Sequence, residues 1–202
     1  MRKWTFKDRI REFLRLFVQT PSKTVSEIAF QQCISPSCLA TFGVDEVLTA
    51  CTKCGGLLDV SYDWNAAAIP ASLSEFESKW SNRHDPLCYS GVWRFRELLP
   101  FAPPEKIVTV GEGQTLLQQT DPVGAFVGLD AGNLFLQYEG MNPSGSFKDN
   151  GMTAAFTHAH MTGASQAACA STGNTSASAA AYGAYCGLPT TVFVPKGYVA
   201  QG

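Results

Sequence analysis

One lysine stands at a place in the sequence where covalent chemistry could be carried out. Lys148 lies in the segment Asn-Pro-Ser-Gly-Ser-Phe-Lys-Asp-Asn-Gly at 142–151, between an apolar run at 134–138 and a stretch rich in Ala, Met and Phe. This order predicts a strand-to-helix turn, with Gly145 supplying backbone freedom. A side chain there can point into the cleft above the strand ends, where open α/β sheets bind ligands. A desolvated lysine amine is nucleophilic, so the position favours imine chemistry; the alternative is a surface lysine at a helix start.

Four of the seven cysteines form a second group with chemical potential. Cys33 and Cys38 are separated by four residues, and Cys51 and Cys54 by two, with twelve residues between the pairs and two glycines directly after Cys54. Two short turns that each offer two thiolates are typical of a tetrahedral zinc site. We therefore predict a structural zinc within a zinc-ribbon-like segment at 23–64. The alternative is a ribbon whose four thiols are free.

The elements that must position Lys148 follow a regular order from residue 134 onward. We predict strands at 134–138, 166–170 and 190–194, and helices at about 147–161 and 174–186. Strands that alternate with helices through short connections indicate a parallel sheet with right-handed crossovers. The expected fold class is therefore α/β, with a parallel three-layer sheet at 107–202.

A second polar turn, Ser-Thr-Gly-Asn-Thr at 171–175, follows the middle strand. Hydroxyls, a glycine and an amide at a helix N-terminus favour an anionic ligand, because free N–H groups and the helix dipole point outward there. The alternative is an ordinary helix cap without a ligand. Two such turns at consecutive strand ends predict one cleft that contains both Lys148 and Asn174.

The rest of the chain divides into three segments. Residues 1–22 carry an apolar stripe at helical spacing and predict an amphipathic helix that packs on its own protein or a partner subunit, with a membrane surface as the alternative. The ribbon-like segment at 23–64 lacks a basic face with aromatic residues for binding nucleic acid. Residues 65–106 read as connecting helices.

Composition narrows the class of protein. Of the 202 residues, 45% are hydrophobic, which is enough for a real core, and the net charge of -2 disfavours a nucleic-acid partner. The sequence has no apolar run near the roughly 18 residues that span a bilayer, and its N-terminus lacks the pattern of a secretory signal. We expect a cytoplasmic protein with no membrane or nucleic-acid partner.

The sequence resembles the threonine synthases, a family of fold-type II pyridoxal-phosphate enzymes in the tryptophan synthase β group. The segments that carry the resemblance are 111–115 (Gly-Glu-Gly-Gln-Thr), 142–152 and 170–176. The resemblance implies that Lys148 is the Schiff-base lysine, that Asn174 hydrogen-bonds the ring hydroxyl of the cofactor, and that Phe147 supports the pocket. Three hydroxyls would lie in the loop that receives the substrate carboxylate: Ser171, Thr172 and Thr175.

The implied activity is the conversion of O-phospho-L-homoserine and water to L-threonine and phosphate with pyridoxal 5'-phosphate, in a protein that could be a homodimer. The alternatives are a serine/threonine dehydratase-like enzyme and an inactive zinc-ribbon interaction module. The sequence departs from many relatives at Leu116, where proline is common, and at Asn150, where arginine is common. Because relatives run well beyond 202 residues, we expect an N-terminal fragment that lacks the phosphate-binding loop and alone binds cofactor poorly.

Overall fold

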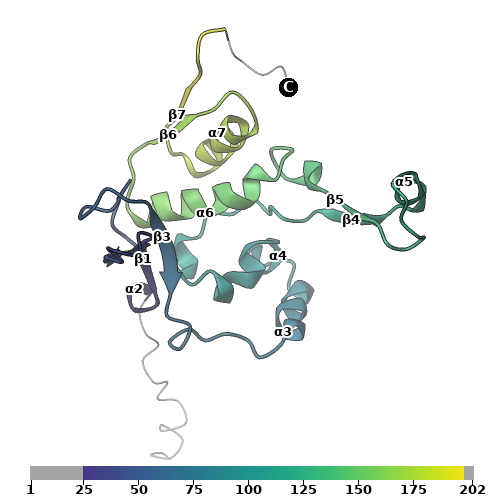
Figure 1. Ribbon diagram of the computed structural model, residues 1–202, viewed down its shortest axis with the longest axis horizontal. Coiled ribbons are helices and arrows are strands. Elements are labelled where there is room, and N and C mark those ends of the chain that lie inside the picture. The colour runs from purple at the N-terminus through teal and green to yellow at the C-terminus, as the bar shows by residue number, and fades with distance from the viewer. Residues whose placement is uncertain (1–24, 198–202) are drawn as a thin grey trace, which may run out of the picture.

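The computed structural model describes residues 25–197, so the helix predicted within residues 1–22 lies outside the described chain. Helix α6 (Lys148–Met161) runs through the middle of the molecule (Figure 1). Helix α7 (Asn174–Cys186) and the strands that flank it lie on one side of α6, and the ribbon and the short helices lie on the other. In the described residues, no helix has both the length and the apolar character needed to cross a bilayer.

The ribbon is a three-stranded antiparallel sheet that follows a short helix, α2 (Val25–Ile28). Its strands are β1 (Ala29–Cys33), β2 (Thr41–Gly43) and β3 (Leu58–Tyr62), in the order β2-β1-β3. Burial alternates along β1, as expected where one face of a strand is covered, and it places Ala29 and Cys33 inside.

Short helices connect the ribbon to the second half of the chain. They are α3 (Leu73–Ser78), η1 (Lys79–Ser81), α4 (Pro86–Tyr89), η2 (Trp93–Leu98) and η3 (Pro104–Lys106). Trp93 is fully buried in a core with Ala29 and Val44 of the ribbon segment, and Met161 of α6 packs against the same core. His158 of α6 also hydrogen-bonds through Nε2 to the carbonyl of Val44 at 2.7 Å. The ribbon is therefore docked on α6.

The helices and strands around α7 confirm the predicted order in that part of the chain. Strands β6 (Ala167–Ala170) and β7 (Thr190–Phe193) pair in parallel, with Cys169 opposite Val192, and α7 connects them. A second core of Val108, Phe156, Ala179 and Tyr182 joins α6 to α7. The buried faces of α6 and α7 therefore pack against each other.

The prediction that 134–138 belongs to the same parallel sheet is wrong. Strand β5 (Phe135–Tyr138) pairs antiparallel with β4 (Leu116–Gln119). In the sequence, α5 (Asp121–Phe126) connects the two strands, and η4 (Glu139–Met141) follows β5. All residues of both strands are exposed, and the hairpin extends away from the body (Figure 1). The backbone groups of β5 are satisfied by a strand close in sequence, so among residues 25–197 the parallel sheet has two strands.

Candidate active site and metal centre

Lys148 is the first residue of α6. Its backbone N–H forms a hydrogen bond, whereas its side-chain amine is accessible. Its N–H donates to Ser146 Oγ at 3.3 Å, and Gly145 before it has a φ of +82°. Its Nζ lies 4.4 Å from the centre of the Phe147 ring, a cation–π contact with a side chain that is 54% exposed. Within residues 25–197 Lys148 forms no ion pair, so its amine is available to a ligand.

The carboxylate of Asp149 organises the turn before the lysine. Asp149 is fully buried, and its oxygens accept hydrogen bonds from Ser144 N–H at 2.6 Å and from Ser144 Oγ at 2.5 Å. A third bond comes from Ser178 Oγ of α7. This carboxylate therefore joins the lysine turn, α6 and α7.

The polar turn at 171–175 forms the start of α7. Gly173 is the N-cap, and in the described part of the chain no side-chain hydrogen bond caps this helix. Ser171 Oγ accepts from the N–H of Gly173 at 3.3 Å, Thr172 and Thr175 are half-buried, and Asn174 is exposed. The positive end of the helix dipole is therefore accessible beside the amide of Asn174.

The structure brings Lys148 and Asn174 to the same end of two neighbouring helices. Ser178 lies one turn after Asn174, about 6 Å along the helix axis, and it bonds to Asp149, the residue after Lys148. A Cβ added at Gly173 would meet no atom within 4 Å, so open space borders this turn. The predicted proximity of the two turns is thus present, although their strands do not share a sheet.

A second buried carboxylate, Glu112, was not singled out by sequence reasoning. Its oxygens accept hydrogen bonds from Ser90 Oγ at 2.6 Å, Thr109 Oγ1 at 2.8 Å and Tyr182 OH at 2.7 Å. Burial, together with the hydrogen bond to Glu112, raises the pKa of Tyr182 above the usual range for a tyrosine. Glu112 therefore connects the 111–115 segment to α7.

The 111–115 segment also contacts the lysine turn directly. Gly113, with a φ of +80°, donates its N–H to Asn142 Oδ1 at 2.8 Å, and Asn142 begins the segment that contains Lys148. The burial of Glu112 was harder to predict, because two of its donors, Ser90 and Tyr182, lie 22 and 70 residues away.

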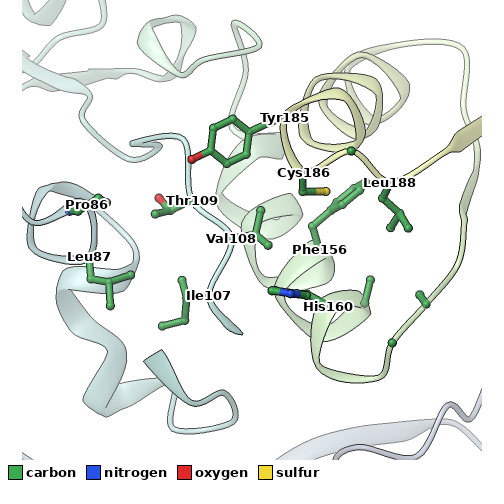
Figure 2. A pocket seen from close by; sticks show the side chains of 14 residues that line it. Pro86, Leu87, Ile107, Val108, Thr109, Phe156, His160, Tyr185, Cys186 and Leu188 are labelled. Carbon is green, nitrogen blue, oxygen red and sulfur yellow. The ribbon is translucent and has the colours of Figure 1, made fainter. Parts of the chain in front are cut away.

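A cavity of about 460 Å³ lies elsewhere (Figure 2). Its walls include Leu87 and Ile107 on one side and Phe156, His160 and Leu188 on the other. His160 is twelve residues beyond Lys148 in sequence, or about 18 Å along α6. The cavity is therefore at the opposite end of the helices from Lys148 and does not form part of the lysine site.

The four cysteines of the ribbon form one cluster. All four Sγ atoms of Cys33, Cys38, Cys51 and Cys54 lie within 4.8 Å of one another, with Cys33–Cys54 at 3.4 Å and Cys38–Cys51 at 3.7 Å. Cys33 and Cys51 are buried, and Cys54 is exposed. The structure thus assembles the four residues that the sequence spacing predicted as ligands.

The glycines after Cys54 shape the second turn of the cluster. Gly55 has a φ of +73° and donates its N–H to the carbonyl of Cys51 at 2.8 Å, while the N–H of Gly56 donates to Cys54 Sγ at 3.4 Å. Burial raises the pKa of Cys51, but hydrogen bonds from the N–H groups of Lys53 and Cys54 lower it, leaving the pKa at about 7. The turn therefore favours thiolate at Cys51.

Comparison with known proteins identifies relatives of this chain. Residues 108–201 match the family described as "Pyridoxal-phosphate dependent enzyme". The chain is 43% identical over 165 residues to the threonine synthase of Methanosarcina acetivorans, an alignment that covers 82% of this chain and 37% of that protein. It is 42% identical over 172 residues to the threonine synthase of Methanocaldococcus jannaschii, covering 85% of this chain and 39% of that one. A threonine synthase of Synechocystis sp. is 46% identical over 108 residues, 54% of this chain and 28% of that protein.

The chain thus spans less than two fifths of the length of the first two of these relatives. Both alignments cover more than four fifths of the chain. These alignments, of 165 and 172 residues, are longer than the family match at 108–201. The similarity therefore extends beyond the region that matches the pyridoxal-phosphate dependent enzymes.

Proposed function

This chain is a relative of the threonine synthases among the pyridoxal-phosphate dependent enzymes, and we propose that it supplies the cofactor-bearing lysine of a threonine synthase. The reaction is the conversion of O-phospho-L-homoserine and water to L-threonine and phosphate. The observation that carries the proposal is the joint between α6 and α7. The hydrogen bond from Ser178 to Asp149 joins the turn that bears Lys148 to the helix that begins at Asn174.

The residues of these two turns fit the chemistry of the cofactor. An aldehyde needs an amine without a competing ion pair, which Lys148 offers. A phenolic ring oxygen needs a neutral donor, which the amide of Asn174 offers. The open space at Gly173 leaves room for a ring to approach the backbone.

When bound, pyridoxal phosphate supplies an electron sink for the carbon from which a proton is removed. Lys148 acts as the general base that takes the proton from the α carbon of the substrate and later returns one. The substrate carboxylate binds at the start of α7, where the helix dipole and the hydroxyls of Ser171, Thr172 and Thr175 favour an anion. Phe147 packs beside the lysine and limits water at the amine.

The test measures products formed from O-phospho-L-homoserine by the protein at full length. We expect L-threonine and phosphate in equal amounts, and we expect Lys148→Ala to lose activity by a factor of at least about a thousand. Release of a 2-oxo acid in place of threonine would indicate a dehydratase-like enzyme. Turnover by Lys148→Ala at the unaltered rate would refute the role of the lysine.

We also propose that the cysteine cluster holds one structural zinc ion. Sulfur atoms bound at about 2.3 Å to one tetrahedral zinc lie about 3.8 Å apart, close to the 3.7 Å between Cys38 and Cys51. The small ribbon gains order from such a metal, since a sheet of this size has little core of its own. Reduced thiols at this position fit a cytoplasmic protein. Elemental analysis that finds well under one zinc per chain would contradict the proposal.

A further inference from the structure

The carboxylate of Asp149 is buried next to Lys148 without a compensating cation. Among residues 25–197 it forms no ion pair, and the hydrogen bonds described above all come from neutral groups of Ser144 and Ser178. Burying a carboxylate is costly unless its lone pairs find donors. The carboxylate in turn gives the N–H of Ser144 and the hydroxyl of Ser178 an acceptor. A buried, fully bonded carboxylate at this position therefore points to a role other than packing.

The Asp149 bonds fix the backbone on both sides of Lys148. Because Ser144 donates twice to Asp149, the chain from 144 to 149 closes into a loop around the carboxylate. Lys148 lies inside that loop, and its own N–H is held by Ser146. The base of the lysine side chain is thus fixed, whereas its amine contacts only the Phe147 ring among the described interactions. The loop therefore fixes the point from which the Lys148 side chain extends.

The same carboxylate reaches α7 through one helix face. Asn174, Ser178 and Tyr182 are spaced four residues apart and lie on a common face of that helix. Ser178 donates to Asp149, while Tyr182 donates to Glu112 and lies 3.3 Å from the backbone carbonyl of Asp149. Asn174 occupies the N-terminal end of this face. The separation of Lys148 from Asn174 is therefore set where Asp149 meets Ser178.

We propose that Asp149 is a positioning residue for the Lys148 amine, holding it at a fixed place relative to Asn174, and that Glu112 supports this arrangement through Tyr182. The inference rests on the proposed function, because the distance between the amine and the amide matters when both contact the same cofactor. Nothing in the arrangement requires Asp149 to touch a ligand.

The test compares Ser178→Ala and Asp149→Asn with the control Thr157→Val in the full-length protein. Thr157 is a matched control because it is also a fully buried hydroxyl residue on this helix pair, and it accepts from Val108 N–H at 2.9 Å. Three quantities would be measured: the melting temperature without cofactor, the dissociation constant of pyridoxal phosphate from an absorbance titration, and the rate at which an amine-reactive reagent labels Lys148 in cofactor-free protein.

We expect Ser178→Ala and Thr157→Val to lower the melting temperature by a similar amount, about 2–4 °C. Only Ser178→Ala should also raise the dissociation constant, by about tenfold, and change the labelling rate of Lys148 severalfold, because the amine is displaced from its fixed place. Asp149→Asn should have the larger effect on both. The test does not require Asp149→Asn to fold, because Ser178→Ala probes the same hydrogen bond.

Equal effects of Ser178→Ala and Thr157→Val on the dissociation constant and on the labelling rate would overturn the positioning role. The proposed function fails in a different way. If borohydride reduction of the unaltered protein with pyridoxal phosphate leaves Lys148 unmodified, the lysine does not carry the cofactor. The labelling rates of cofactor-free protein would still decide whether Asp149 fixes the amine.

Discussion

The substitution Tyr182→Phe measures how much the hydrogen bonding of Tyr182 contributes to the free energy of unfolding. Tyr182 is fully buried and packs in the core with Phe156, at a ring-centre separation of 5.9 Å. The change removes one oxygen and leaves the ring and its packing in place, so it creates almost no cavity. What it removes is the hydrogen bond of 2.7 Å from the hydroxyl to Glu112, together with the longer one of 3.3 Å to the carbonyl of Asp149.

The expected loss follows from the charge on the acceptor. A hydrogen bond to a charged group contributes about 1.5–3 kcal/mol. Glu112 keeps three other donors, from Ser90, Thr109 and the N–H of Val110, so the loss should be near the lower end, about 2 kcal/mol. That corresponds to about a thirtyfold change in the unfolding equilibrium.

The environment of Tyr182 also affects how the free energy of unfolding depends on pH. The pKa of Tyr182 is raised in the folded protein, chiefly by burial and then by Glu112. Above pH about 10 the unfolded chain loses this proton and the folded chain keeps it, so the free energy of unfolding falls by about 1.4 kcal/mol per pH unit. Below that pH both states keep the proton and the contribution is constant. Tyr182→Phe should lack this part of the alkaline decline.

Urea denaturation at pH 7.5 and at several values between pH 10 and 11.5 measures both effects. Tyr185→Phe is the control at pH 7.5, because Tyr185 lies on the same helix but is 63% exposed; its free energy of unfolding should change by less than about 0.5 kcal/mol. If Tyr182→Phe matches this control at pH 7.5 and declines above pH 10 as steeply as the unaltered protein, the hydrogen bond to Glu112 does not have the assigned weight.

Two further predictions concern the ribbon and the glycines. Cys51→Ser should reduce bound zinc from about one per chain to nearly none, whereas Cys186→Ser, outside the cluster, should retain it; equal zinc content in elemental analysis would contradict the assignment. Gly91→Ala should lower the free energy of unfolding by at least about 1–3 kcal/mol, because the new Cβ would lie 2.3 Å from the carbonyl oxygen of Gly113. Gly151→Ala in α6 should instead raise it by about 0.5–1 kcal/mol, since its Cβ would meet no atom within 4 Å; denaturation curves that shift in the same direction for both glycines would refute this contrast.

Local patterns in the sequence were sufficient for the elements around the lysine. The helix predicted at 174–186 has those bounds in α7, and α6 begins within one residue of the prediction. These segments are bounded by turn residues that act locally, such as Gly187, whose φ of +70° ends α7. The cysteine cluster was likewise predictable, because close pairs of cysteines fold on short turns.

The pairing of β5 was not predictable in the same way. The run at 134–138 is apolar and short, and such a run fits a buried parallel strand and an exposed hairpin strand equally well. Its partner, β4, falls in a segment for which no strand was predicted. Glu112 and Asp149 were missed as buried groups for a related reason. Acidic residues are usually exposed, and some of the hydroxyls that make their burial acceptable, those of Ser90, Ser178 and Tyr182, come from distant parts of the chain.

The hydrogen bond between His158 and the carbonyl of Val44 has a consequence for the order of events during synthesis. At roughly 5–20 residues per second, the 114 residues between these partners take about 6–23 s to translate. Strands β1 and β2 are made before Val44, and β3 is made early in that interval. The cysteine cluster can therefore assemble, and take up metal, seconds before the helix that will cover Val44 has been made.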